Sequence, residues 1–199
     1  MRKYAPFIHL QAALLLCIGG PAARAAPDVK FIDGGYAQLC SSAAQNLDTL
    51  TSFTITGSRL PLSAVEVCTL AITAGDSDAA NLAGSYNNRG VLLFAQGDFS
   101  GSLRDFDKAR RLTDTLPEVD VNRGYALVAL ERWAEAVEAL DRGIAQGAPE
   151  LAKAYHSRGI AHEELGNVRQ AYYDYLEAAE LDPEWETPRE ELSRFEVKR

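Results

Sequence analysis

The chain has 199 residues, of which 47% are hydrophobic and 24% are charged. It carries 20 Lys and Arg against 28 Asp and Glu, so its formal net charge is −8. This acidity argues against nucleic acid and anionic membrane surfaces as partners, and the length suits a single domain.

Residues 1–25 have the pattern of a secretory signal peptide. Arg2 and Lys3 provide a positive start, residues 7–19 are mostly apolar, and Ala23-Arg24-Ala25 fits the small-x-small rule for cleavage. The apolar run is shorter than the about 20 residues that span a membrane, so we expect cleavage after Ala25 and no membrane span afterwards. The protein is then periplasmic or secreted, and the processed chain carries 17 basic and 28 acidic residues, a formal charge of −11.

Export would leave two cysteines, Cys40 and Cys68, because Cys17 lies in the signal segment and follows a leucine, not the small residue that lipidation requires. An even pair in an exported chain indicates a disulfide, whereas two buried free thiols are the alternative. Both cysteines lie in expected helices, at about 36–47 and 62–73. We predict an N-terminal helical hairpin within residues 26–78, which acts as a cap or a degenerate repeat. One bridge would stabilise it by about 3 to 4 kcal/mol on the chain-entropy model.

The Thr- and Ser-rich residues 48–61 join these two helices, and we expect them to form a surface loop. Gly75 and the residues after it link the hairpin to the next part of the chain. Ser77 or Asp78 is the expected N-cap of the helix that follows.

Three copies of one pattern occupy residues 79–185, at about 83–116, 117–151 and 152–185. Gly90, Gly124 and Gly159 are 34 and 35 positions apart, and each follows an arginine. Small and apolar residues follow each glycine at matched offsets. This pattern resembles the tetratricopeptide repeat (TPR) family, in which each repeat is a pair of helices. The chain is similar to an exported bacterial TPR protein.

The resemblance implies an all-α fold, a right-handed αα-superhelix of helical hairpins. Residues 186–199 would form a C-terminal capping helix that begins at Pro188. Each glycine should lie where its two helices cross, opposite a small residue of the second helix. These predicted contacts pair Gly90 with Ser102, Gly124 with Ala136, and Gly159 with Ala171.

The turn between the two helices of a repeat falls on Gly97, Glu131 and Gly166. Glycine adopts a left-handed turn at little cost. Glu131 would either accept strain of about 1 kcal/mol or more in such a turn, or use a different turn.

The recurrent arginines Arg89, Arg123 and Arg158 admit two interpretations. They form a ladder that grips acidic ligands, or they are structural, with stems packed between helices and heads paired to carboxylates. Asp105 and Asp174 lie 16 residues after the first and third arginines, whereas the middle repeat has Ala139 there and Asp141 nearby. The shared offset favours the structural interpretation.

In the family that the chain resembles, the first helices line a concave groove. The groove positions here are Asn87, Val91, Phe94, Val121, Tyr125, Val128, His156, Ile160 and Glu163. The lysines with which chaperone-binding members hold a carboxylate are missing. A groove that is apolar near Phe94 suits a helix or an extended peptide with apolar anchors. Alternatively, the C-terminal helix covers part of it.

We expect no enzyme, no metal and no cofactor. His156 and His162 are six residues apart rather than the four of a metal-binding pair, and no nucleophile or phosphate-binding motif is present. The expected function is a non-enzymatic protein-binding scaffold of the cell envelope. Alternatives are a self-associating structural subunit, and then a Sel1-like protein that binds or hydrolyses β-lactams, although that type has a cysteine pair in nearly every repeat.

Overall fold

The computed structural model describes residues 35–45, 63–74 and 78–195, and within these ranges every regular element is an α-helix. The helices are α2 (Gly35–Gln45), α3 (Ala64–Ala74), α4 (Ala79–Ala95), α5 (Phe99–Leu112), α6 (Pro117–Ala129), α7 (Trp133–Ala145), α8 (Leu151–Glu164), α9 (Val168–Leu181) and α10 (Thr187–Leu192). The predicted signal segment, its cleavage site and the loop at 48–61 lie outside the described residues.

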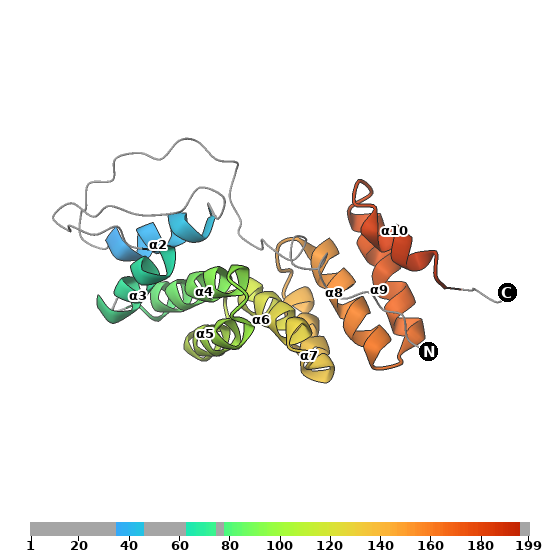
Figure 1. Cartoon of the computed structure of the whole chain (residues 1–199), viewed down its shortest axis with the longest axis horizontal. Coiled ribbons are helices and arrows are strands. Elements are labelled where there is room, and N and C mark those ends of the chain that lie inside the picture. Colours follow the sequence, from blue (N-terminus) through green and yellow to red (C-terminus); the bar gives the residue numbers. More distant parts are fainter. Residues whose placement is uncertain (1–34, 46–62, 75–77, 196–199) are drawn as a thin grey trace.

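The helices pair in chain order into hairpins that stack along the long axis of the molecule (Figure 1). The pair α2–α3 lies at one end, the hairpins α4–α5, α6–α7 and α8–α9 follow, and α10 packs against α9. The αα-solenoid that the repeat spacing predicted is therefore confirmed.

The two cysteines join the first pair of helices. Cys40 of α2 and Cys68 of α3 form a disulfide, with their Cα atoms 4.6 Å apart, and both side chains are fully buried. They belong to one apolar cluster with Leu92 of α4, so the predicted disulfide is confirmed and the hairpin that it pins rests on the first repeat.

Local sequence explains where the helices begin and turn. Asp78 caps α4, because its carboxylate accepts a hydrogen bond of 3.0 Å from the backbone N–H of Ala80. The turns after α4 and α8 use Gly97 and Gly166 at φ of 83° and 78°. Glu131 adopts φ of 57° at the same point of the middle hairpin, which decides between the two expected turns in favour of the left-handed one.

The three repeat glycines mark close crossings, but not with the predicted partners. A Cβ atom would lie 2.6 Å from Phe106 Cε1 at Gly90, 2.5 Å from Leu140 Cγ at Gly124, and 2.7 Å from Tyr175 Cε1 at Gly159. The expected helices do cross there. The residue opposite each glycine is a large apolar one four positions beyond the predicted small one, because it fills the space that the missing side chain leaves.

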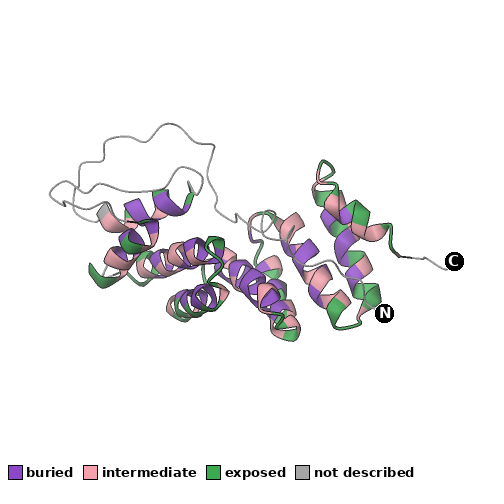
Figure 2. Cartoon of the chain, in the orientation of Figure 1, coloured by how far each residue is buried: buried purple, intermediate pink, exposed green. Residues whose placement is uncertain are grey.

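Burial is greatest in the middle of the stack. Helix α6 is buried along most of its length, whereas the outer helices are exposed along one side (Figure 2). Its core residues include Val119, Val121, Leu127 and Val128, each without exposed surface. A hairpin with a neighbour on both sides has fewer faces left for solvent.

Candidate protein-binding surface

The predicted groove positions fall on the three first helices α4, α6 and α8, as expected, but most of them are buried. The buried members are Asn87, Val91, Phe94, Val121, Tyr125, Val128 and His156. Only Ile160 and Glu163 keep intermediate exposure. The prediction of exposed apolar anchors at Phe94, Tyr125 and Val128 is therefore wrong, since these side chains are 8%, 2% and 0% exposed.

Packing across the hairpins explains this correction. Helix α6 contacts α4 and α5 on one side and α7 and α8 on the other. Val121 lies directly against Gly143 of α7, where an added Cβ would collide with its methyl group. Tyr125 and Val128 belong to the same continuous core cluster. The middle of the presumed groove is thus part of the core that joins the hairpins.

Asn87 has a structural partner instead of a ligand. The side-chain amide of Asn122 on α6 donates a hydrogen bond of 3.0 Å to Asn87 Oδ1 on α4, and both residues are buried. Because a buried amide without a partner costs about 1 to 3 kcal/mol, the pair fixes how these two helices lie against each other.

His156 is enclosed by aromatic rings. Its ring centroid lies 5.5 Å from that of Tyr175 and 4.8 Å from that of Trp185, and its Nε2 has no hydrogen-bond partner among the described residues. Burial lowers the pKa of His156 to about 4, so the ring is neutral near pH 7. Within the described residues no three His, Cys, Asp or Glu side chains form a group that could hold a metal ion.

Glu163, the last predicted groove residue, is tied to the C-terminal segment. Its carboxylate accepts hydrogen bonds of 2.8 and 2.9 Å from Arg194 and one of 2.9 Å from the Tyr175 hydroxyl. Burial and the charge of Glu163 raise the pKa of Tyr175. The ring of Phe195, just beyond α10, also lies 5.9 Å from that of Tyr175. The alternative that the C-terminal segment covers part of the groove therefore holds at this end.

The recurrent arginines bind carboxylates inside the molecule. Arg89 donates hydrogen bonds of 2.6 and 2.8 Å to Asp105, and one of 3.1 Å to Thr69 of the preceding hairpin. The hydrogen bond to Asp105 raises the pKa of Arg89. The predicted 16-residue pair is present, which supports the structural interpretation.

The other two arginines extend this arrangement. Arg158 donates to Asp174 at 3.0 and 2.6 Å within its repeat and to Asp141 of the preceding hairpin at 2.6 Å. Burial alone would lower the pKa of Arg158, but its bonds to Asp174 and Asp141 raise it. Arg123 reaches only the preceding hairpin, where it donates to Asp107 at 2.7 Å. Each arginine thus links two hairpins, a connection that offsets within one repeat do not reveal.

Asp120 is a buried charge that the sequence pattern did not single out. Its side chain is 1% exposed, and it lies 3.1 Å from Arg110 Nε and 3.2 Å from Arg142 Nε. The sequence does mark Asp120 as unusual, because the equivalent positions of the outer hairpins hold Tyr86 and Tyr155. An acidic side chain near a helix start, at a position where the other repeats have an aromatic ring, needs basic neighbours to compensate its charge.

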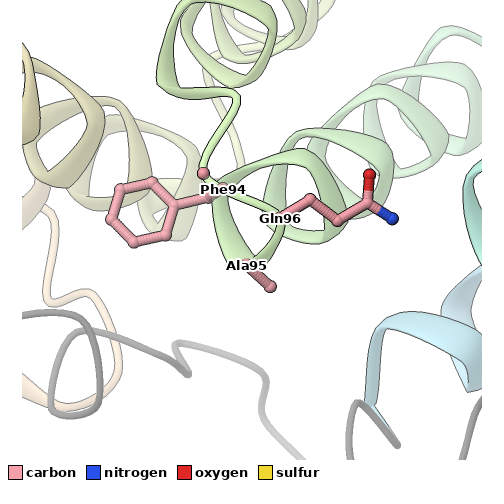
Figure 3. Close-up of a pocket in the computed structure, with 4 residues that line it drawn as sticks. Phe94, Ala95 and Gln96 are labelled. Atoms are coloured by element: carbon pink, nitrogen blue, oxygen red, sulfur yellow. The ribbon is translucent and has the colours of Figure 1, made fainter.

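A small hollow of about 170 Å³ adjoins the turn after α4. Its described lining is Phe94, Ala95, Gln96 and Gly97 (Figure 3). The side chains of Phe94 and Gln96 point to opposite sides of the helix end (Figure 3). This described lining contains no charged side chain, so the hollow does not define a ligand class.

Within the described ranges, the large apolar side chains that are classed as exposed lie in the third hairpin. Leu165 is 43% exposed, Val168 56%, Tyr173 53% and Leu181 47%. Leu165 and Val168 flank the turn between α8 and α9. Spacing along the chain did not single out this surface, because apolar residues of a repeat are ordinarily expected in its core. None of the helices in the described ranges is long and apolar enough to cross a membrane.

These features define a stack of helical hairpins of the TPR type. The family model described as Tetratricopeptide repeat matches residues 152–185, the third hairpin. The third hairpin therefore matches the repeat of that family.

A curated relative matches a longer part of the chain. The human protein described as FK506-binding protein-like is 29% identical over 129 residues, which cover 61% of this chain and 37% of the relative. This chain therefore spans little more than a third of that relative's length.

Two solved structures are similar in fold. MamA from Desulfovibrio magneticus RS-1 is 20% identical with a TM-score of 0.62, over 81% of this chain and 84% of that one. The first TPR of Spaghetti (RPAP3), bound to the HSP90 peptide SRMEEVD, is 25% identical with a TM-score of 0.55, over 58% of this chain and 90% of that one.

Proposed function

We propose that this protein is a non-enzymatic binding scaffold of the TPR type that works in the cell envelope after export. The observation that carries the proposal is the apolar surface at the α8–α9 turn. Leu165 and Val168 are 43% and 56% exposed, and they flank one turn, whereas Tyr173 and Leu181, the other exposed large apolar side chains of the described residues, lie further along α9. Exposed apolar residues grouped at one place mark a contact surface.

A protein partner suits this surface better than a small substrate does. The RPAP3 TPR domain, 25% identical to this chain, was solved with a peptide bound. The two histidines left after export are engaged in packing, His156 against Trp185 and His162 beside Asn167 at 3.3 Å. Neither is placed to act as a general base on a bound substrate.

The partner differs from the acidic HSP90 peptide SRMEEVD to which the RPAP3 domain is bound. The lysines of the carboxylate clamp are missing here, and the middle of the groove is closed by Val121, Tyr125 and Val128. Residues 152–185 contain three basic and seven acidic residues. This surface therefore favours a helix or an extended segment with apolar anchors and basic flanks.

Site-specific crosslinking tests the surface. A photoreactive amino acid at position 168 should trap the partner in intact cells, and Val168→Asp should reduce its capture with the purified protein. Position 138 is a matched control, because Glu138 is also exposed but lies on α7, outside the α8–α9 turn. Equal capture from positions 138 and 168, or none from 168, would refute this surface.

Export is supported by the disulfide, because such bonds persist mainly in oxidising compartments. Fractionation should place the chain in the periplasm or medium, starting at Ala26, with Cys40 and Cys68 inaccessible to thiol reagents after denaturation. A cytoplasmic chain with two reactive thiols would refute export without affecting the crosslinking result.

A further inference from the structure

The outward side of α5 carries a basic stripe, defined as Arg104, Lys108 and Arg111. All three are exposed, and their spacing of four and then three residues places them on one side of the helix. No carboxylate of the described residues forms a salt bridge with them, whereas Arg89, Arg110 and Arg123 are all paired. Lys108 lies over the ring of Tyr86, with its Nζ 5.1 Å from the centroid.

Two of the three equivalent positions in the third repeat carry the opposite charge, and the other holds Tyr173. Tyr173, Glu177 and Glu180 form an acidic stripe along the outward side of α9. All three are exposed, and the two glutamates have no basic partner within 4.0 Å among the described residues. The stripes share their spacing because they occupy equivalent positions of the repeat.

Charge is therefore separated along the solenoid. Residues 83–116 hold five basic and four acidic residues, whereas residues 117–151 and 152–185 each hold three basic and seven acidic ones. Helices α5 and α9 belong to the first and last hairpins of the repeat array (Figure 1). A molecule with a positive stripe near one end and a negative stripe at the other is complementary to a second copy of itself.

We propose that copies of this protein associate head to tail, with the basic stripe of α5 on one molecule against the acidic stripe of α9 on the next. Lys108 is the central residue of one stripe and Glu177 of the other, so they face each other whichever way the helices run. Tyr173 offers its ring to an arginine of the opposite stripe, as it does to Arg169 in its own helix at 5.8 Å.

The geometry sets the type of assembly. The two stripes are different surfaces, so a pair of molecules in contact still has one unused stripe at each end of the pair. Further molecules can add there, and the assembly does not close as a dimer. Exposed ion pairs are weak and screened by salt, so the assembly should be reversible and sensitive to ionic strength.

This assembly goes beyond the proposed partner binding and uses another surface. Val168 and Tyr173 are five residues apart on α9, which separates them by about 140° around the helix. A variant that loses partner binding can therefore be distinguished from a variant that loses self-association.

Sedimentation of the processed chain tests the proposal. Wild-type mass should rise with protein concentration at an ionic strength of about 0.01 M and should not rise at about 1 M. Lys108→Glu and Glu177→Lys should each weaken association by about five- to tenfold, because an attractive pair becomes a repulsive one. Glu138→Lys makes the same charge change on α7, outside both stripes, and should leave association unchanged.

The decisive measurement is the mixture of the two variants. In an alternating assembly, one contact joins the intact acidic stripe of Lys108→Glu to the intact basic stripe of Glu177→Lys. The next contact joins the two altered stripes, where the exchanged charges at positions 108 and 177 again attract, so the mixture should associate about as strongly as the wild type. Failure of the mixture to associate, or wild-type behaviour of the single variants, would overturn the proposal. Circular dichroism melting of each variant checks that it is folded.

The same variants also test whether the basic stripe binds an anionic lipid surface instead of a second copy of the protein. If wild-type protein binds vesicles that contain an anionic lipid, and Lys108→Glu abolishes that binding while Glu177→Lys does not affect the mass, the stripe serves a lipid surface. That result would also overturn the proposal.

Discussion

The middle hairpin departs from the repeat pattern at two positions where the hairpins on either side of it follow the pattern. The outer ones have glycine at the turn and a carboxylate within the repeat for their arginine, Asp105 or Asp174. The middle one has Glu131 at φ of 57° and an arginine that is paired only across hairpins. Helix α6 of the middle hairpin is nevertheless the most deeply buried of the three first helices. The family model, in contrast, matches the third hairpin, residues 152–185.

The difference shows where the stability of a repeat comes from. A middle unit packs on two neighbours, and these interfaces add to whatever its own sequence provides. Asp120 of α6 is held by Arg110 of the hairpin before it and by Arg142 of its own second helix. The outer repeats pack on only one other repeat and, on the far side, on α2–α3 or on α10, so they depend more on their own pattern and on these caps.

Acidification should show how far the third hairpin depends on its own side chains. His156 has a folded pKa of about 4 against 6.5 for an ordinary histidine. Between these values the unfolded chain binds a proton that the folded chain does not, so the free energy of unfolding falls as the pH drops from about 6.5 to 4, by up to about 3 kcal/mol. Val121 occupies the equivalent position of the middle repeat and does not titrate.

Urea unfolding at pH 7, 5.5 and 4.5 measures this slope. His156→Val should reduce the slope, leaving only the contributions of other groups. An unchanged slope in the variant would mean that His156 does not stay neutral in the fold.

The crossing at Gly124 tests how firmly the middle hairpin is packed. Gly124→Leu should cost about 1 to 3 kcal/mol, because the added carbon would lie 2.5 Å from the branch point of Leu140. Gly159→Leu should cost less, since the nearest atom there is on the ring edge of Tyr175, next to the end of the stack. Denaturant midpoints of the two variants compare them, and a larger loss at Gly159 would contradict the role given to neighbours.

The arginines sharpen the comparison. Arg158→Ala should lower the free energy of unfolding by about 1 to 2 kcal/mol, because it removes charged hydrogen bonds to Asp174 and Asp141. Arg123→Ala removes one bond to the partly exposed Asp107 and should cost less than about 1 kcal/mol. Thermal melting ranks the two, and equal losses would show that the pair within the repeat adds nothing.

The smallest effect concerns the turn. Glu131→Gly should raise the free energy of unfolding by about 1 kcal/mol or less, because glycine adopts a positive φ without strain but gains freedom in the unfolded chain. Gly97→Glu is the reverse change in the first hairpin, where no atom lies within 4 Å of the new Cβ, so only the backbone is affected. It should lower stability, and a gain there would contradict the assignment of strain to φ.

Sequence alone determined the period, the helical hairpins, the Cys40–Cys68 bridge and the 16-residue offset of the outer arginine pairs. Each depends on residues in one repeat or on a pair that helical spacing and export bring together. Spacing along a helix fixes which residues share a face, and three copies in phase confirm that choice.

The tertiary structure decided which of those faces remain open. Phe94, Tyr125 and Val128 share the face that lines a groove in the family, but adjacent hairpins bury them, while Val168 and Tyr173 stay exposed. The bonds from Arg123 to Asp107 and from Arg158 to Asp141 likewise cross between hairpins. Exposure and pairing of this kind depend on how repeats stack, and a repeat's own sequence does not contain the position of its neighbour.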